Sequence, residues 1–443
     1  MEFTRVFHPF TRRAFVSRAA AAPFVIRHLL SASPNSTLRL AAFGGGGMAW
    51  YTLDGIATHP KVKLACVADV DSSRVDHVKQ KYPDAKIYQD WRQMLAREKH
   101  NIDIACISTP DHMHAPQALS AMRQGLPVYV QKPLTHDLHE ARGLANMAGR
   151  KKLVTQMGIQ IHSRREYKIA AALVRNGAIG KIKEVHSWSE KKWGDPDPLP
   201  DRSDTIPSTL DWDQWLGVAS PRPFIADVYH PLNWRKRLDF GTATFGDMGC
   251  HILDPVVTAI GLTAPLSVRS EGAAPNRQSW ALDSEIRFVF QGTPFTAEPT
   301  MPLAWYDGDR RPPAEIQSLV TPGTIPGQGS IFVGTKGAML LPHIDMPLLF
   351  PSAQFAGYMM PQAESENHYH QFVEAVLGNT QASAPFSYSG PLTEIVLLGA
   401  LSTRFPKTTL EWRSGKLKFH NVAEANEHVT RSYRDGWKVK GLG

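Results

Sequence analysis

The chain has little cysteine: Cys66, Cys106 and Cys250 are its only thiols in 443 residues, and each lies beside apolar or glycine residues. Three such thiols exclude a disulfide framework and predict buried cysteines. The sequence also lacks any run of about 18 apolar residues, which excludes an integral helical membrane protein. Disorder is excluded in turn, because 42% of the residues are hydrophobic and 20% are charged, a balance typical of folded domains.

The length of the chain and the distribution of its charge bear on the number of domains and on the kind of partner. A chain of 443 residues exceeds what one hydrophobic core usually supports, so we expect two domains. The net charge of +8 is concentrated in residues 1–36, which hold five arginines and one acid, Glu2. The remaining charges are mixed in sign and form no basic stripe with interleaved aromatic residues, so we expect no nucleic-acid partner.

Residues 1–36 resemble an export leader. Thr11-Arg12-Arg13-Ala14-Phe15-Val16 is followed by an alanine run and Pro-Phe-Val-Ile, a pattern similar to a twin-arginine signal. We expect export to the periplasm, with an uncleaved basic extension on a cytoplasmic enzyme as the alternative. An exported enzyme would have to keep its cofactor through turnover, because soluble nicotinamide cofactor is not replenished outside the cytoplasm.

A dinucleotide-binding fingerprint follows the leader. The apolar run 38–43 predicts a buried strand, and it leads directly into Gly44-Gly45-Gly46-Gly47-Met48-Ala49 and an amphipathic segment. In a strand, glycine turn and helix, Gly44 would form the tight turn and Gly46 would let the backbone approach a pyrophosphate at the helix N-terminus.

The acid expected for the ribose comes at the end of the next strand. Residues 62–68 predict that strand, and Asp69 follows it, 25 residues after Gly44. A carboxylate there accepts hydrogen bonds from ribose hydroxyls and repels a 2′-phosphate, so we expect NAD. Arg74 lies close enough in sequence to keep NADP as the less favoured cofactor. Asp69 could instead cap a helix.

Strands and helices alternate through the rest of the first half. The pattern predicts helices over 91–98, 115–124 and 138–150 and strands over 102–107, 127–130 and 153–157. Apolar strands separated by helices indicate a parallel sheet covered on both faces, with ligands at the carboxyl ends of its strands. Two polar clusters, 108–114 and 131–133, occupy those ends and should line a cofactor cleft.

Four motifs together carry a family resemblance: Gly-Gly-Gly-Gly-Met-Ala at 44–49, Ser-Thr-Pro-Asp-His-Met-His at 108–114, Gln-Lys-Pro at 131–133 and Gly-Asp-Met-Gly-Cys-His-Ile-Leu-Asp at 246–254. In this order they resemble the glucose-fructose oxidoreductase and inositol dehydrogenase family (Gfo/Idh/MocA). The resemblance implies a Rossmann domain, 37–162, followed by an α+β domain, 163–443. In the family that second domain has a large, mostly antiparallel open sheet that often forms an oligomer interface, so we expect a dimer or tetramer.

The cofactor contacts follow from these motifs. We expect the nucleotide to be bound by residues from the glycine turn and from the ends of the parallel strands, namely Gly44, Gly46, Gly47, Met48, Asp69, Ser108, Thr109, Pro110, His114, Gln131 and Gln160.

Asp247, His251 and Asp254 form the most specific local pattern of candidate catalytic residues. Their spacing of i, i+4 and i+7 places all three on one helix face, although acids near a helix N-terminus can be purely structural. By resemblance His251 is the catalytic histidine, Lys132 is the active-site lysine, and the two aspartates orient base and substrate. Alcohol oxidation needs such a base and such a cation.

One position departs from the family. Its usual Glu-Lys-Pro reads Gln131-Lys132-Pro133 here. The loss of a carboxylate next to Lys132 predicts a lowered lysine pKa, so that Lys132 could share the role of the base.

Two segments suggest a carbohydrate substrate. The stretch from Trp193 to Trp215 is rich in tryptophan, proline and aspartate and is long enough to be functional, although it could equally be a surface excursion packed by its own tryptophans. The stretch 229–235 offers Tyr229 and Arg235. We expect Trp193, Tyr229, Arg235 and Asp254 to contact substrate, with a structural ion pair as the alternative for Arg235.

The predicted function is NAD-dependent oxidation of a secondary hydroxyl of a sugar or glycoside, with C3 as a candidate position. One alternative is a redox-neutral lyase, hydrolase or epimerase that retains NAD. The other is a non-catalytic ligand-binding or regulatory protein on the same fold. We expect no metal site, because the pairs His112/His114 and His368/His370 lack neighbouring ligands.

Overall fold

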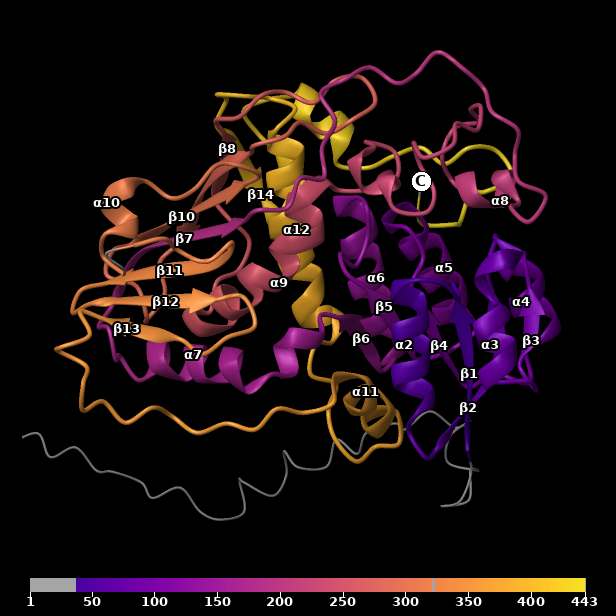
Figure 1. Cartoon of the computed structure of the whole chain (residues 1–443), viewed down its shortest axis with the longest axis horizontal. Helices are drawn as coiled ribbons and strands as arrows, with labels where there is room; N and C mark the ends of the chain where they lie inside the picture. The colour runs from indigo at the N-terminus through magenta and orange to yellow at the C-terminus, as the bar shows by residue number, and fades with distance from the viewer. Residues whose placement is uncertain (1–36, 321–322, 443) are drawn as a thin grey trace, which may run out of the picture.

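The computed structural model describes residues 37–320 and 323–442, so the predicted leader, 1–36, lies outside the described residues. Two β-sheets lie at opposite ends of the molecule, and the long helices α9 (Ala243–Ile260) and α12 (Phe386–Ser402) lie between them (Figure 1). In the described part of the chain, no helix combines the length and the apolar character needed to cross a membrane.

The first sheet is parallel and, among the described residues, has six strands in the order β3-β2-β1-β4-β5-β6. The predicted Rossmann fold is thereby confirmed. The short β3 is missing from the prediction because its three residues include no apolar run. The strands are β1 (Leu38–Phe43), β2 (Val62–Ala68), β3 (Lys86–Tyr88), β4 (Ile104–Ile107), β5 (Val128–Gln131) and β6 (Thr155–Gly158).

Alternate residues of these strands belong to different cores, since side chains of a strand point to opposite faces. In β1, Ala41 and Phe43 join a core with the helices α4 (Trp91–Arg97), α5 (Asp111–Arg123) and α6 (Leu138–Lys151). Leu40 and Ala42 of β1 join the opposite core, with α2 (Met48–Ala57), α3 (Asp76–Lys81) and α11 (His368–Val376). Both faces of the sheet are therefore covered by helices.

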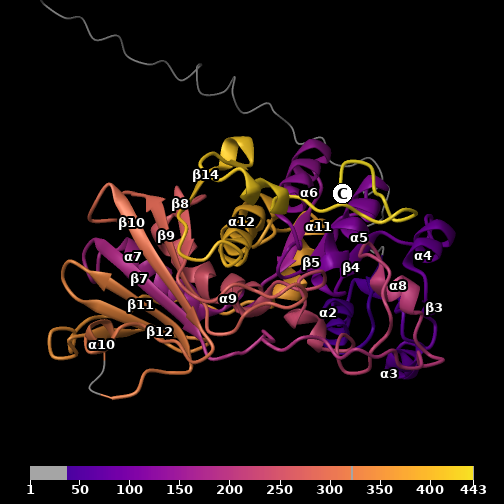
Figure 2. The ribbon, with the colours of Figure 1, turned by 90° about the horizontal axis from the view of Figure 1, so that it is seen from above.

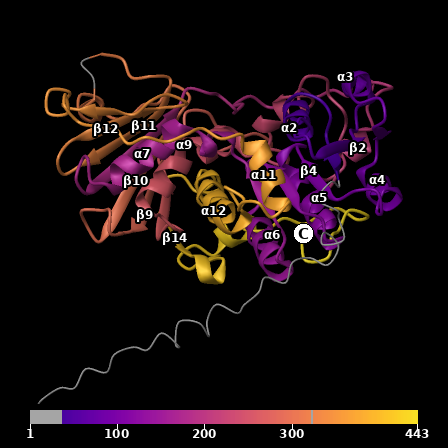
Figure 3. The ribbon, with the colours of Figure 1, turned by 90° about the horizontal axis from the view of Figure 1, so that it is seen from below.

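Helix α11 corrects the predicted division at residue 162. Phe372, Val373 and Val376 pack in the same core as Leu53 of α2, and Figure 3 shows α11 beside α2, far from the second sheet. Helix α12 likewise packs against both α6 and α9. The first domain therefore includes residues from late in the chain, because α11 joins α2 and α3 on one face of its sheet.

The second sheet is mostly antiparallel, as predicted, with one parallel pair, β7 with β10. In the part of the chain that the structure describes it has nine strands, in the order β13-β12-β11-β7-β10-β9-β8-β14-β15. Their bounds are β7 (Ile182–Ser189), β8 (Ser267–Ser270), β9 (Glu285–Gln291), β10 (Thr300–Asp307), β11 (Gln328–Gly334), β12 (Ala338–Pro342), β13 (Leu348–Phe350), β14 (Leu410–Arg413) and β15 (Lys418–Phe419).

One face of this sheet packs on helices. In β9, Ile286, Phe288 and Phe290 are buried in the main core while Val289 on the other face is partly exposed. Helices α9 and α12 lie on the buried side (Figure 2), and α7 (Arg165–Arg175) packs against α9. The short helix α10 (Ala314–Gln317) and its flanks cover part of the outer face through a separate cluster that includes Trp188 and Ile331.

The segment between β7 and α9 crosses from the second sheet to the first domain. Asp71, after β2, pairs with Leu210 in an isolated bridge, and α8 (Trp212–Leu216) follows. This segment has its own aromatic core, in which Trp212 and Trp215 stack with ring centroids 4.8 Å apart. The remaining short helices are η1 (Ser72–Arg74), η2 (Gln160–Ser163), η3 (Asn233–Lys236), η4 (Ser414–Lys416) and η5 (Glu424–His428).

Candidate active site

A cleft of about 410 Å³ lies at the carboxyl ends of the first sheet's strands, where α9 and the crossing segment meet the first domain. Its lining includes the glycine turn, Lys132 and His251. All predicted cofactor residues and all three predicted catalytic residues lie along it. Predicted catalytic residues from both domains, Lys132 from the first and Asp247 and His251 from the second, therefore line one cavity.

The glycine turn is shaped by close approach. Gly44 has φ +96°, and a Cβ there would lie 2.9 Å from the Ala49 Cβ and 3.1 Å from the Ser108 carbonyl oxygen. An L side chain would be both strained and crowded. The Asp69 carboxylate accepts hydrogen bonds from the backbone N–H groups of Gly45 at 2.8 Å and Gly46 at 3.3 Å. Asp69 thus holds the turn and remains partly exposed at the cleft.

These residues fit a dinucleotide. The Ser108 hydroxyl is buried and has no hydrogen-bond partner in the described structure, and Met48, at the first position of α2, is 50% exposed. The Arg74 guanidinium lies over Gly46, where a Cβ would come within 2.5 Å of its Nε. The glycine turn, Ser108 and Arg74 would hold the phosphate end of the cofactor at the N-terminus of α2.

Two residues predicted to bind cofactor, His114 and Gln131, instead make hydrogen bonds within the protein. The ring nitrogens of His114 lie 2.8 Å from the carbonyl oxygens of Pro133 and Thr109, so neither is free for a ligand. His114 instead ties together the two loops that line the cleft. The Gln131 amide donates to the Thr52 hydroxyl at 2.9 Å. Its side chain therefore points toward α2, although Gln131 lines the cleft as predicted.

Lys132 and Asp247 are held together at the centre of the cleft. The Lys132 ammonium donates to Asp247 Oδ1 and to the Asp247 carbonyl oxygen, both at 2.7 Å. Glutamine at 131 therefore does not leave Lys132 without a carboxylate, because Asp247 of α9 supplies one. Two short hydrogen bonds to Asp247 thus fix the position of the Lys132 side-chain nitrogen in the cleft. The suggestion that Lys132 shares the role of the base stays a prediction.

Asp247 is surrounded by donors. Trp193 donates its indole N–H to Oδ2 at 2.8 Å, the Lys191 ammonium lies 3.4 Å from Oδ2, and the Arg235 Nε lies 3.5 Å from Oδ1. Burial opposes ionisation of this carboxyl, but the charges of Lys132, Arg235 and Lys191 outweigh it and hold the pKa of Asp247 well below its usual range. Asp247 thus organises the site's cations.

His251 follows Asp247 by one helical turn, as the spacing predicted. Burial, with further contributions from the charges of Lys132 and His343, holds the pKa of His251 well below its ordinary value. Its Nδ1 is buried and finds no partner among the described residues. His343 lies beside it, with ring centroids 5.9 Å apart, and burial lowers the pKa of His343 to about 4. Both imidazoles are therefore neutral near pH 7 and able to accept a proton.

Two predicted substrate contacts do not line the cleft. The Asp254 carboxylate is almost fully buried and is bonded to Nδ1 of His162 at 2.8 Å and to the Tyr388 hydroxyl. At i+7 the helix has carried Asp254 past the cleft and into contact with neighbouring helices. Tyr229 is 2% exposed and packs in the aromatic core of the crossing segment. Trp193 and Arg235, by contrast, do line the cleft.

Several cleft residues were not predicted. Lys191 lies two residues after the end of β7, and a sign of it was present in the pair Lys191-Lys192 next to Trp193. His343 follows β12, and its place in the cleft depends on the pairing of distant strands. Trp234 packs against Arg235, with its ring centroid 4.3 Å from the guanidinium carbon. Trp234 lies in the predicted substrate stretch 229–235, whereas no local pattern marks His343.

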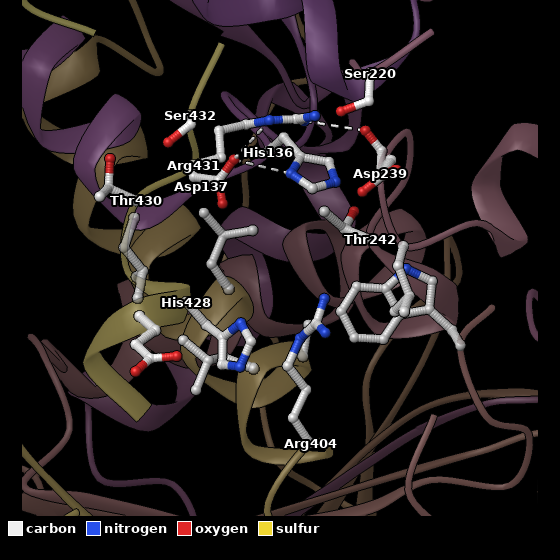
Figure 4. A pocket seen from close by; sticks show the side chains of 17 residues that line it. His136, Asp137, Ser220, Asp239, Thr242, Arg404, His428, Thr430, Arg431 and Ser432 are labelled. Carbon is white, nitrogen blue, oxygen red and sulfur yellow. Dashed lines mark hydrogen bonds and ion pairs between the residues drawn. The ribbon is translucent and has the colours of Figure 1, made fainter. Parts of the chain in front are cut away.

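A second cavity, of about 390 Å³, lies between α6, α12 and the C-terminal segment (Figure 4). In its lining, His136 Nδ1 lies 3.0 Å from the Asp137 carboxylate, and Arg431 contacts both Asp137 and the Asp239 carbonyl oxygen. Neither the glycine turn nor Lys132 lines this second cavity. We therefore place the active site in the first cleft.

The two-domain fold and this cleft define a dinucleotide-binding protein of the oxidoreductase type. The model of the GFO/IDH/MocA oxidoreductase family, NAD-binding Rossmann fold, matches residues 38–159, and the model of its C-terminal alpha/beta domain matches residues 181–292. Together they cover more than half of the chain. The protein belongs to the Gfo/Idh/MocA oxidoreductase family, and its first domain is the family's NAD-binding domain.

Individual relatives agree with this assignment. Scyllo-inositol 2-dehydrogenase (NAD(+)) of Bacillus subtilis is 28% identical over 145 residues, which cover 32% of this chain and 42% of the relative. An alpha-N-acetylgalactosaminidase of Shewanella oneidensis is 28% identical over 162 residues, or 34% and 35% of the two chains. An NAD-binding protein from Listeria innocua shares the fold with a TM-score of 0.59, 16% identity and coverage of 85% and 97%. The match thus spans less than half of either curated relative.

Proposed function

We propose that this protein oxidises a secondary hydroxyl of a sugar or glycoside with NAD as the hydride acceptor. The observation that carries the proposal is that one cleft is lined both by the glycine turn and by Lys132, Asp247 and His251. The similarity to an inositol dehydrogenase supports a polyol substrate. C3 of a pyranoside is the first position to examine.

Each side chain has a task in this reaction. When bound, NAD would supply the acceptor for the hydride from the carbinol carbon. The neutral imidazole of His251 takes the hydroxyl proton, because its lowered pKa keeps it unprotonated near pH 7. The Lys132 ammonium, fixed by two bonds to Asp247, stabilises the negative charge that develops on the substrate oxygen.

The test is NADH formation, followed as absorbance near 340 nm, with NAD and a panel of sugars, glycosides and inositols. We expect turnover with at least one member of the panel and its loss in Lys132→Met. Lys192→Gln is the matched control, because Lys192 is adjacent to the site but pairs with Asp309 on the surface. NAD binding without NADH formation from any member would contradict net oxidation.

The match to an alpha-N-acetylgalactosaminidase favours one further candidate. The same site could oxidise the sugar hydroxyl transiently, which acidifies the C–H of the neighbouring carbon. Loss of that proton would expel the substituent from the next carbon, water would add to the resulting double bond, and return of the hydride would leave no net redox change. Such an enzyme would release nitrophenol from nitrophenyl glycosides without added NAD and would be purified with nucleotide bound. It would also suit an exported protein, for which the cofactor must be retained.

A further inference from the structure

Positive charge exceeds negative charge at the substrate end of the cleft. Lys132, Lys191 and Arg235 all surround the one carboxylate of Asp247, at 2.7, 3.4 and 3.5 Å. Asp111 is the other carboxylate at this end; it is buried, accepts the Thr242 hydroxyl, and has a pKa that burial raises. Three cations therefore face at most two carboxylates.

The histidines of the lining do not change this balance. Burial lowers the pKa values of His251 and His343, so both are neutral near pH 7. His230, the remaining histidine of the crossing segment in the lining, binds Asp71 through Nε2 at 3.0 Å. Burial also lowers the pKa of His114, the fourth histidine of the lining. The excess of positive charge at the substrate end thus comes from Lys132, Lys191 and Arg235.

Two of the three cations are only loosely engaged. Lys132 uses two short bonds to Asp247, whereas Lys191 and Arg235 reach the carboxylate only at 3.4 and 3.5 Å. Within the described residues, the other side-chain hydrogen bond of Arg235 is a long one, 3.5 Å to the Leu232 carbonyl oxygen. A guanidinium has five N–H donors and an ammonium has three. Most donors of Arg235 and Lys191 therefore remain free toward the cleft.

Arg235 is nevertheless held in place. Its guanidinium carbon lies 4.3 Å from the Trp234 ring centroid and 5.4 Å from that of Trp193, and Trp193 is itself bonded to Asp247. Gly241 allows the backbone to approach, since a Cβ there would lie 2.5 Å from the Arg235 Cα. A fixed guanidinium with free donors is suited to carboxylates and phosphates.

The cofactor does not account for these charges. The phosphate end of the dinucleotide site has its own cation, because Arg74 lies over Gly46 and Gly47. Arg235 and Lys191 come from the second domain's side, beside Asp247 on α9. Their free donors therefore face the space left for the substrate.

We propose that the substrate is an anionic sugar, with a carboxylate or phosphate group held by Arg235 and Lys191. This assignment rests on the proposed function, because it concerns the substrate of the same cleft. The anion would fix the sugar at one end, and the hydroxyl to be oxidised would lie toward Lys132 and His251.

Matched probes test the proposal: glucose, glucuronate and glucose 6-phosphate, and the three corresponding galactose compounds. Binding to the NAD-loaded protein is followed by tryptophan fluorescence, since Trp193 and Trp234 flank Arg235, and turnover is followed by NADH absorbance. We expect charged probes to bind at least about tenfold more tightly than the neutral sugar. Comparing the affinities of the carboxylate probes with those of the phosphate probes shows which anion the site prefers.

Variants show where the preference arises. In Arg235→Gln and Lys191→Gln the ratio of charged-probe to neutral-probe affinity should fall about tenfold, because each variant removes a cation that the anion would contact. Arg235→Lys should keep part of the advantage, and Lys192→Gln should keep all of it. A preference for neutral sugars, an advantage that survives both glutamine variants, or no binding of any charged probe at about 10 mM would overturn the assignment.

The outcomes separate this inference from the proposed oxidation. If charged sugars bind through Arg235 but no NADH forms, the proposed anion site is supported and the proposed net oxidation is rejected. If neutral sugars are oxidised without any preference for charge, the oxidation stands and the anionic substrate is rejected.

Discussion

At the scale of single residues, Lys132 depends on Asp247 more than on its neighbour at 131. The three-residue motif 131–133 has glutamine where the family has glutamate, yet a carboxylate from a distant helix lies 2.7 Å from the Lys132 side-chain nitrogen. Sequence reasoning identifies both residues and misses their contact, because the contact joins two domains. The Gln131 side chain is turned to Thr52 instead.

Asp247→Asn should therefore lower kcat/KM by about 10²- to 10³-fold, since it removes the counter-charge that fixes Lys132 and Trp193. NAD affinity should change little, because Asp247 lies at the other end of the cleft from the glycine turn. Steady-state kinetics and nucleotide titration measure the two effects. Asp309→Asn, on the surface, is the control, and an equal loss in both variants would contradict the assigned role.

The pH dependence of turnover follows from His251. Burial and nearby positive charge lower the pKa of His251 in the folded protein, so the base form persists as pH falls below 6.5 and is lost only as pH passes through the lower folded-state value. We expect the acidic limb of kcat/KM to lie below pH 6.5. A limb at or above pH 6.5 would exclude His251 as the base.

At the scale of elements, the glycine turn and α11 bear directly on the function. The turn was predictable, because a buried strand, four glycines and a helix are contiguous in sequence. The position of α11 was not, because a short amphipathic helix near the end of a chain gives no sign of which sheet it covers. It completes the face of the first sheet on which α2 lies.

Gly44→Ala should abolish measurable NAD binding. The added methyl group would meet Ala49 and the Ser108 carbonyl in a conformation with φ +96° that L residues avoid. Nucleotide titration of the purified variant gives the affinity, and circular dichroism checks that the protein is folded. Gly357→Ala, where a Cβ meets nothing within 4 Å, is the control and should bind NAD normally.

His368 should make the attachment of α11 sensitive to acid. Its Nδ1 lies 2.7 Å from the Ser163 hydroxyl and its Nε2 2.9 Å from the Met157 carbonyl, and burial lowers its pKa to about 4. Above pH 6.5 the ring is neutral in both folded and unfolded states. Below pH 6.5 the unfolded chain takes up a proton that the folded chain does not, which costs up to about 3 kcal/mol by pH 4.

The measurement is the free energy of unfolding of the parent and of His368→Gln between pH 7 and pH 4. The variant should be less stable at pH 7 but lose less stability on acidification. Parallel pH profiles would show that His368 does not contribute to the acid sensitivity.

At the scale of the whole molecule, the order of domains and both sheet types could be predicted, because each strand is a local apolar run and the motifs are contiguous. The bounds of β1 and β2 were predicted to the residue, since glycine and aspartate end them. The nine-strand order of the second sheet, the return of α11 and α12, and the places of Lys191 and His343 depend on contacts between distant segments, which one sequence does not specify.

Because residues of both domains line the cleft, a bound nucleotide should stabilise the folded chain as a unit. At a concentration of about 100 times Kd, NAD should add about 2.7 kcal/mol to the free energy of unfolding. Thermal melts with increasing NAD measure this, and Gly44→Ala should show no shift. Separate melting of the two halves, with only one responding, would contradict the shared core.

The position of Phe372, Val373 and Val376 in the core beneath α2 has a consequence for synthesis. The nucleotide-binding half is translated first, yet its apolar core stays incomplete until the last part of the chain emerges from the ribosome. NAD capture should therefore begin only after residues 372–376 have emerged, and a nascent chain stalled before residue 372 should expose Leu53 and its neighbours to chaperones.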